Sequence, residues 1–140
     1  MIHTCTSLVL HCIDFRFGSA IKNYLESNNL IGDCDIVAVA GATKNIADPV
    51  EPTDRAFVLR QFANSRRLHD TKEAILINHT DCGGYGGRSA FSSDEEERNR
   101  HISDMKKAKE IILQFLPDLA VKTVLAKISP SGEVNFEEVE

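Results

Sequence analysis

Two short apolar runs, each ending in a group of polar residues, constrain most strongly what this chain can fold into. Leu-Val-Leu at 8–10 precedes His-Cys-Ile-Asp-Phe-Arg at 11–16, and Ala-Ile-Leu-Ile at 74–77 precedes His-Thr-Asp-Cys-Gly-Gly at 79–84. Short continuous apolar runs are typical of strands buried on both faces, as in parallel sheets. We therefore expect Cys12, His79 and Cys82 to lie where two buried strands end.

These three residues form a suitable ligand set for zinc, because thiolates and imidazole are ligands that this metal prefers. Three protein ligands leave a fourth position open, as in catalytic zinc sites, whereas structural sites usually have four protein ligands. Asp14 and Arg16 follow Cys12 closely and place a carboxylate and a guanidinium beside the expected metal. The sequence therefore predicts a zinc enzyme with Cys12, His79 and Cys82 as the ligands of one Zn²⁺ per chain.

The pattern resembles the signature of the β-class carbonic anhydrases, in which Cys-x-Asp-x-Arg is followed many residues later by His-x-x-Cys-Gly. The resemblance extends to residues 37–41, where the family has its second strand and an Asn-Ala-Gly turn, and to residues 127–134, which resemble the closing hairpin. Three residues differ from the family pattern. Phe15 stands where a small residue is commoner, and Ala38 and Val39 replace an Arg and an Asn.

The resemblance implies reversible hydration of carbon dioxide to bicarbonate by a hydroxide formed on the zinc. Asp14 would accept a hydrogen bond from that hydroxide, and Arg16 would pair with Asp14 and keep it ionised and turned away from the metal. Apolar residues near the strand ends would provide an unhydrated pocket for carbon dioxide; the candidates are Phe15, Val39, Ala40 and Ile46. Because family members are dimers or multiples of dimers, a homodimer or a larger assembly is also implied.

Helical and strand patterns alternate along the chain. We predict strands at 7–13, 35–40, 74–79, 123–128 and 134–139, and helices at 19–27, from Thr53 or Asp54 to about 68, and from Ser93 to Pro117. Ser93 and Glu96 predict a capping box at the start of the last helix. Residues 41–52 are predicted to form a loop, because two prolines limit helix formation there.

This alternation predicts an α/β fold in a single domain spanning residues 1–140, with a mostly parallel sheet and helices on both faces. Ligands of such sheets bind beyond the carboxyl ends of the strands, at a point where the strand order reverses. Periodicity alone does not choose the order of the strands. A shared metal between Cys12 and His79 makes the first and third strands neighbours. With the second strand on the far side of the first, the order is 2-1-3-4, and the turn at 131–132 adds an antiparallel edge strand at the C-terminus. The family resemblance implies the same order.

Two alternative functions can be compared with the zinc enzyme. His11-Cys12 followed by Arg16 superficially resembles the His-Cys-x5-Arg loop of cysteine phosphatases, but only three residues separate Cys12 from Arg16, and Gly18 occupies the position that loop gives to Arg. The second alternative keeps the zinc but not the activity. It is a zinc-stabilised binding module, favoured by the replacements at positions 15, 38 and 39. The other cysteines and histidines are expected to be buried or surface structural residues: Cys5, Cys34, His3, His69 and His101.

The composition of the chain limits which binding partners and which cellular compartment are expected. The 16 basic and 21 acidic residues give a net charge of −5, which argues against a nucleic-acid partner. No apolar stretch is long enough to span a membrane, and residues 1–4 lack the charged region that begins a signal peptide. We therefore expect the four cysteines to be reduced thiols in the cytoplasm rather than two disulfides.

Overall fold

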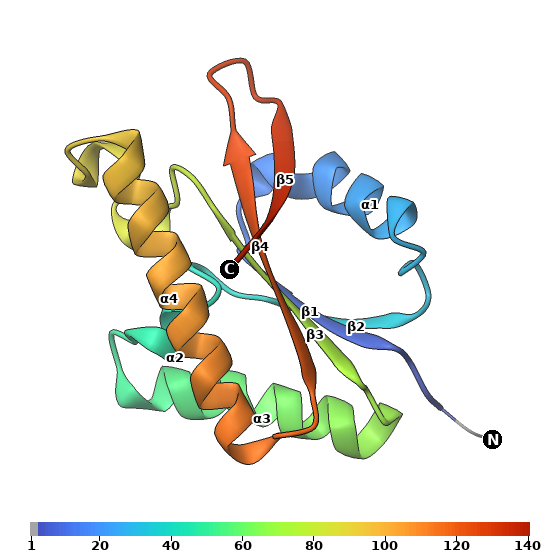
Figure 1. The fold of residues 1–140 in the computed structure, drawn as a ribbon. Helices are drawn as coiled ribbons and strands as arrows, with labels where there is room; N and C mark the ends of the chain where they lie inside the picture. Colours follow the sequence, from blue (N-terminus) through green and yellow to red (C-terminus); the bar gives the residue numbers. More distant parts are fainter. Residues whose placement is uncertain (1–2) are drawn as a thin grey trace.

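The computed structural model describes residues 3–140, and Figure 1 shows its strands as one twisted sheet. Residues 1 and 2, part of the segment in which no signal peptide is expected, lie outside the described residues. The strands are β1 (Ser7–His11), β2 (Cys34–Ala38), β3 (Glu73–His79), β4 (Ala120–Ile128) and β5 (Val134–Val139). Their order is β2-β1-β3-β4-β5, with parallel neighbours throughout except for the antiparallel pair β4 and β5. The predicted fold class and strand order are thus confirmed.

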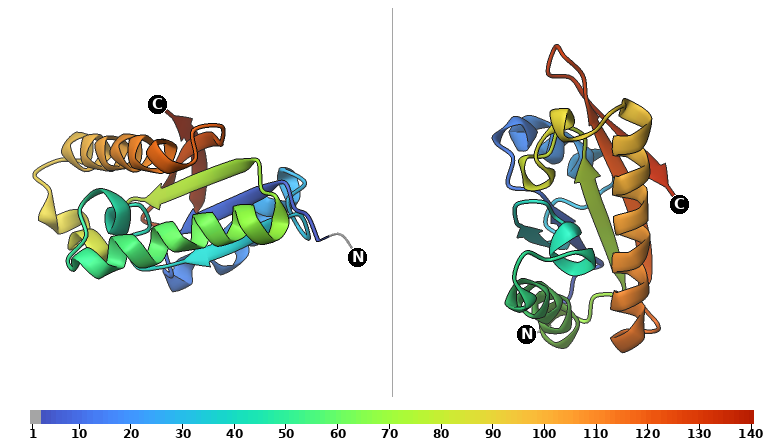
Figure 2. Two further views of the ribbon diagram at one scale, coloured as in Figure 1. Left: turned by 90° about the horizontal axis from the view of Figure 1, so that it is seen from below. Right: turned by 90° about the vertical axis from the view of Figure 1, so that its left-hand side faces the viewer.

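Helices cover both faces of the sheet. They are α1 (Gly18–Ser27), α2 (Lys44–Ala47), α3 (Pro52–His69) and α4 (Asp94–Phe115). Helix α1 lies on one side of the strands, and α3 and α4 lie on the other (Figure 1). Two further views show α4 as one long helix alongside β3 and β4 (Figure 2). Within residues 3–140, no helix has both the length and the apolar character needed to cross a membrane.

The apolar run of β1 is explained by this layering, because successive strand side chains point to opposite faces. Val9 packs in the cluster beneath α1, whereas Leu8 and Leu10 pack in the cluster beneath α2, α3 and α4. All three side chains are buried. The edge strand β2 differs, since its Ile36 is 53% exposed. The continuous apolar pattern therefore marks the central strands, whose carboxyl ends carry the predicted ligands.

The segment predicted as a loop at 41–52 contains the short helix α2, so that prediction is wrong. The prolines at 49 and 52 follow this helix and do not oppose it, and its Ile46 and Ala47 are buried against the sheet. The predicted cap of α3 at Thr53 or Asp54 is also wrong. Glu51 is the N-cap, and Asp54 is its partner three residues into the helix. The carboxylates at both positions complete a reciprocal capping box, with Pro52 in the first turn.

The remaining boundaries differ by a few residues. Strand β1 ends at His11 rather than at 13, β2 spans Cys34–Ala38, and β4 begins at Ala120. Ser93 caps α4 as predicted, and its side chain accepts a hydrogen bond from the backbone N–H of Glu96. The Glu96 carboxylate, however, accepts from the backbone N–H of Ser92 rather than of Ser93, so only half of the predicted capping box forms.

Candidate metal centre

The carboxyl ends of β1 and β3 bring the three predicted ligands together. Cys12 follows the last residue of β1, His79 is the last residue of β3, and Cys82 returns to the same place after one turn. These side chains are 5%, 1% and 2% exposed, and their ligand atoms all lie within 4.8 Å of one another. The two sulfur atoms are 3.9 Å apart. A tetrahedral zinc with Zn–S bonds of about 2.3 Å would separate them by about 3.8 Å.

The hydrogen bonds of His79 also suit a metal ligand. Its Nδ1 lies 2.7 Å from the backbone oxygen of Thr80, which can only accept, so Nδ1 carries the proton in the neutral ring. Nε2 then bears the free lone pair, and it is buried without a hydrogen-bond partner among the described residues. A buried acceptor without a partner is costly unless something binds it. The residues present therefore fit a zinc ion held by two sulfurs and one imidazole nitrogen.

The two thiols of this group titrate as a pair. A hydrogen bond from Cys82 lowers the pKa of Cys12, whereas the hydrogen bond to Cys12, followed by burial, raises the pKa of Cys82. Binding of a divalent metal by two thiolates requires both sulfurs to be deprotonated, so metal affinity should weaken as pH falls.

Asp14 and Arg16 form a tight ion pair beside the three ligands. Arg16 Nε donates to Asp14 Oδ1 at 3.0 Å, and Nη2 donates to Oδ2 at 2.8 Å. The backbone N–H of Arg16 also donates to Oδ1, so Asp14 caps the short 3₁₀ turn that follows. The hydrogen bond from the Arg16 guanidinium lowers the pKa of Asp14 to about 2, and the same contact raises the pKa of Arg16. Asp14 is therefore an acceptor-only carboxylate at neutral pH.

Sequence reasoning missed Asp81, which lies between two predicted ligands along the chain. Its carboxylate accepts a hydrogen bond from Arg16 Nη1 at 3.0 Å, and its backbone oxygen accepts one from Nη2 at 3.0 Å. The backbone N–H of Asp81 donates to Glu97, a buried carboxylate of α4. Its place in the sequence could have identified Asp81. It follows β3 closely, as Arg16 follows β1, and the carboxyl ends of these parallel neighbours lie at the same edge of the sheet.

A buried polar network fastens the loop after β3 to α4. The Asn78 side-chain oxygen accepts a hydrogen bond from Thr43 Oγ1 at 2.7 Å, and its amide nitrogen lies 3.0 Å from both Tyr85 Oη and His101 Nδ1. Tyr85 in turn donates to Asp104 at 2.8 Å. Burial lowers the pKa of His101 to about 4, so this ring is neutral. The prediction that His101 is a structural residue agrees with these contacts.

Close backbone packing holds the same loop from the other side. A Cβ built on Gly84 would lie 2.7 Å from the Cα of Gly41 and 2.9 Å from its nitrogen. Real Cβ atoms do not approach so closely, so only glycine fits at position 84 unless the backbone moves. The loops that follow β2 and β3 are thus in direct contact, and this contact fixes Cys82 relative to the end of β2.

A shallow hollow of about 380 Å³ lies beside Cys12 and Asp14, and its apolar lining includes Ile13, Phe17 and Ile21. Phe15 stands at the rim of this hollow and is 92% exposed, so its ring does not fill the site. Of the other residues expected to form a pocket for carbon dioxide, Ile46 is fully buried in the cluster beneath α2, with Val39 packed against that cluster. The expectation that Ile46 lines the pocket is wrong. Helix α2 directs its side chain into the core beneath α2, α3 and α4, on the face of the sheet opposite to α1.

A second group with metal-ligand chemistry lies at the other end of the sheet and comprises Cys5, Asp35 and His69. Here the side chains already have hydrogen-bond partners: His69 Nδ1 lies 2.7 Å from Asp35 Oδ2, which also accepts from Ser65 at 2.6 Å. The Cys5 thiol lies within hydrogen-bonding distance of Ser7 O and Thr71 Oγ1. This saturation contrasts with the free nitrogen of His79 and agrees with the structural roles expected for Cys5 and His69.

Comparison with known proteins identifies a family for this chain. A family model described as "Putative carbonic anhydrase" matches residues 2–135. An uncharacterized protein of Rickettsia bellii is 27% identical over 139 residues, covering 97% of this chain and 85% of its own.

Solved structures resemble the fold as well. The β-carbonic anhydrase isoform I of Trichomonas vaginalis has a TM-score of 0.62 at 11% identity, covering 97% of this chain and 85% of its own. A tetrameric β-carbonic anhydrase of Sordaria macrospora has a TM-score of 0.52 at 17% identity, with 99% and 84% covered. The chain has the fold of the β-carbonic anhydrases and belongs to the family whose model is described as "Putative carbonic anhydrase".

Proposed function

We propose that this chain catalyses the reversible hydration of carbon dioxide to bicarbonate, with one zinc ion held by Cys12, His79 and Cys82. The observation that carries the proposal is the short distance between two groups: the buried ligand cluster, and the Asp14–Arg16 ion pair beside it. Asp14 Oδ2 lies 3.7 Å from His79 Nε2. A metal site that only stabilised the fold would have no use for an ionised carboxylate held at this distance.

When bound, zinc would act as a Lewis acid and make a water molecule acidic enough to lose a proton near neutral pH. Asp14 would accept a hydrogen bond from the reacting water and orient its lone pair toward carbon dioxide. Its low pKa keeps it in the accepting form across the physiological range. Arg16 would hold the Asp14 carboxylate in place, since two parallel hydrogen bonds fix both oxygens.

The hollow beside Cys12 would receive the substrate. Carbon dioxide has no charge and only weak acceptors, so the apolar side chains of Ile13, Phe17 and Ile21 suit it better than a hydrated surface does. Bicarbonate is charged and would leave such a surface readily. The exposed position of Phe15 leaves the hollow open from solvent.

The decisive experiment measures hydration of carbon dioxide by stopped flow, with zinc content determined on the same sample. We expect metal-dependent hydration that increases with pH and is inhibited by anions. Removal of zinc by a chelator should abolish the activity, and restored zinc should return it. A protein that takes up zinc and gains thermal stability, but hydrates carbon dioxide no faster than buffer at any pH, would instead be a zinc-stabilised binding module.

We also propose that the chain forms a homodimer or a multiple of dimers. Exposed apolar side chains support this assembly: Phe15 is 92% exposed, Ile13 63% and Ile36, on the edge strand β2, 53%. The Sordaria macrospora protein with a related fold is described as tetrameric. We further propose a cytoplasmic location, because a site with two cysteine ligands requires a compartment that keeps thiols reduced.

A further inference from the structure

Arg16 lies between two carboxylates and uses every nitrogen of its guanidinium. Nε and Nη2 donate to Asp14, while Nη1 donates to the Asp81 carboxylate and Nη2 also to the Asp81 backbone oxygen. These two sets of contacts approach the planar group from different sides. A rotation of the Arg16 side chain away from Asp81 would therefore also change its hydrogen bonds to Asp14.

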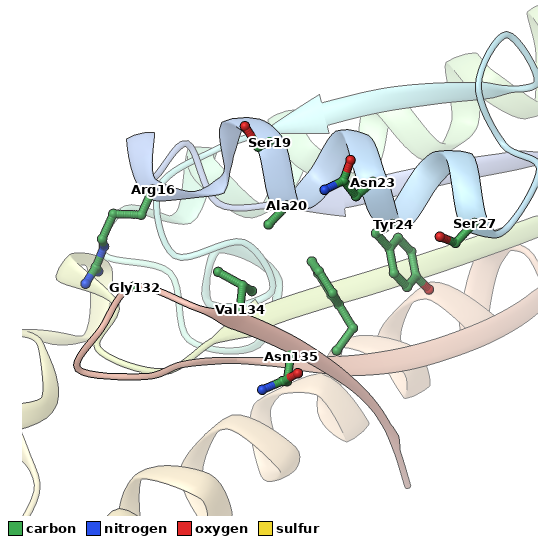
Figure 3. Close-up of a pocket in the computed structure, with 10 residues that line it drawn as sticks. Arg16, Ser19, Ala20, Asn23, Tyr24, Ser27, Gly132, Val134 and Asn135 are labelled. Atoms are coloured by element: carbon green, nitrogen blue, oxygen red, sulfur yellow. The ribbon is translucent and has the colours of Figure 1, made fainter.

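Arg16 borders open space on one side. It lines one end of a groove of about 540 Å³ between α1 and the hairpin of β4 and β5, where it extends toward Gly132 (Figure 3). Its side chain is 30% exposed. Because the groove leaves one side of Arg16 open, the guanidinium is held there by its hydrogen bonds rather than by packed side chains.

Asp81, in contrast, is fixed from several directions. Its backbone N–H donates to Glu97 Oε2 at 2.7 Å, and its Oδ1 accepts from the backbone N–H of Arg88 at 2.8 Å. Its φ of 56° lies in the left-handed region, which Asp tolerates better than most residues. A Cβ at Gly87 would lie 3.3 Å from Oδ1, so a side chain there would crowd this carboxylate. The loop is thus shaped around the Asp81 side chain.

We propose that Asp81 is a positioning residue: it anchors Arg16 so that Arg16 holds Asp14 away from the metal ligands. The inference rests on the proposed metal site and extends it by one residue. Asp14 Oδ2 already lies 3.7 Å from His79 Nε2, so a small rotation would bring the carboxylate to any metal bound there. With Arg16 anchored on Asp81, that rotation breaks the paired hydrogen bonds to Asp14.

The geometry also explains why an aspartate is needed. Each carboxylate oxygen accepts from a different donor, Oδ1 from Arg88 and Oδ2 from Arg16. An asparagine has only one accepting oxygen, and its amide would place N–H groups against one of these two donors. Asp81→Asn should therefore release one of the two contacts and weaken the attraction to the guanidinium.

The test uses cobalt(II)-loaded protein, whose visible absorption reports binding of thiocyanate to the metal. In D81N we expect thiocyanate affinity to fall about tenfold, because the released Asp14 competes for the position and one charge-assisted hydrogen bond is lost. The double variant D14N/D81N should regain the affinity of D14N, since the competing carboxylate is gone. If D81N lowered the affinity only by loosening the loop, replacing Asp14 as well would not restore thiocyanate binding.

Asp94→Asn is the matched control. Asp94 lies 3.9 Å from the Arg88 side chain but is 92% exposed and does not contact Arg16, so D94N should bind thiocyanate as the wild type does. R16K tests the same bridge without altering Asp81, because one ammonium cannot engage both carboxylates as the guanidinium does. It should weaken thiocyanate binding, and D14N/R16K should restore it.

Thiocyanate affinity that is unchanged in D81N or in R16K, or that stays low in D14N/D81N, would overturn the positioning role. Since hydration is not measured, a cobalt-binding chain without activity would refute the proposed function and still leave this inference to be decided by thiocyanate. A chain that binds no cobalt would refute both.

Discussion

His79 Nε2 and Asp14 Oδ2 lie 3.7 Å apart, too far for a hydrogen bond, although both are shielded from solvent. The separation exists because Arg16 draws the carboxylate to itself by two hydrogen bonds. His79 is thereby left with a buried nitrogen that has no partner among the described residues. The Asp14–Arg16 ion pair thus keeps the Asp14 carboxylate ionised and near the ligand cluster, but prevents it from forming a hydrogen bond with His79.

The first prediction concerns the ligands. Replacement of Cys12 or Cys82 by Ser, or of His79 by Ala, should reduce the zinc content from about one per chain to near zero after dialysis against a weak chelator. Mass spectrometry of the metal provides the measurement. Bound zinc should also stabilise the wild type by about 2.7 kcal/mol at a free zinc concentration of 100 times Kd, and these variants should lose that gain.

Cys5→Ser and Cys34→Ser are the controls for this experiment, because both residues lie at the opposite end of the sheet and are only partly buried. They should retain the zinc. Loss of metal from C34S but not from C12S would contradict the ligand assignment.

The second prediction compares two adjacent glycines. Gly84→Ala would force a Cβ to within 2.7 Å of the Gly41 Cα, whereas a Cβ at Gly83 would meet nothing within 4 Å. We expect G84A to lower the free energy of unfolding by about 1–3 kcal/mol and to weaken zinc binding, because the loops around Cys82 must separate. Urea unfolding and zinc content measured on both variants check this. Equal stability of G84A and G83A would show that the loops do not pack as described.

The sequence revealed the parallel core because Leu8, Leu10 and their counterparts in β3 form continuous apolar runs. It could not reveal helix α2, since four residues make too short a pattern to separate from a loop, and Ile46 is recognisable as core only once the sheet lies beneath it. The juxtaposition of Cys12 with His79 follows from parallel neighbouring strands. The bridge from Asp81 to Arg16 does not, because it depends on a left-handed turn at Asp81.

The third prediction concerns acid sensitivity. The pKa of Asp14 is about 2 in the folded chain, below the value of about 3.9 expected when unfolded. A lowered folded-state pKa stabilises the fold above the unfolded-state pKa, and this stabilisation is lost as pH falls toward 2. In the presence of a chelator, the free energy of unfolding of the wild type should therefore fall more steeply between about pH 5 and 2 than that of D14N, by about 1–2 kcal/mol.

Urea unfolding at a series of pH values measures this difference. Glu26→Gln is the control, because Glu26 forms an exposed pair with Lys22 and such pairs contribute little. Parallel pH profiles for the wild type and D14N would mean that the pair with Arg16 does not stabilise the folded chain.

The fourth prediction concerns Phe15. Because its ring is 92% exposed at the rim of the hollow, Phe15→Ser should not increase the hydration rate. It should instead weaken self-association by at least about tenfold, since an exposed aromatic ring beside the site gains most from burial in a second copy. Sedimentation velocity across a concentration series measures the dimer, and Val50→Ser, at a residue 81% exposed in the loop before α3, is the control. A large gain in rate would show that the ring obstructs the substrate.

The last prediction tests the ion pair in catalysis. Asp14→Asn should keep the zinc but lower kcat/KM for carbon dioxide by at least about a hundredfold, because the amide no longer offers the reacting water an ionised acceptor. Arg16→Ala should also keep the zinc. Its Asp14 would then be free of both parallel hydrogen bonds and close enough to the ligand cluster, at 3.7 Å from His79, to block it.

The two losses should therefore not add: D14N/R16A should be no slower than R16A alone, because the blocking carboxylate is absent from the double variant. Lys22→Ala removes an exposed cation of α1 that pairs with Glu26 at 3.7 Å, and it should leave the rate unchanged. Stopped-flow rates and zinc contents for all four variants decide the point. Full activity in both D14N and R16A would show that Asp14 and Arg16 take no part in the mechanism. The metal ligands alone would then account for the hydration of carbon dioxide.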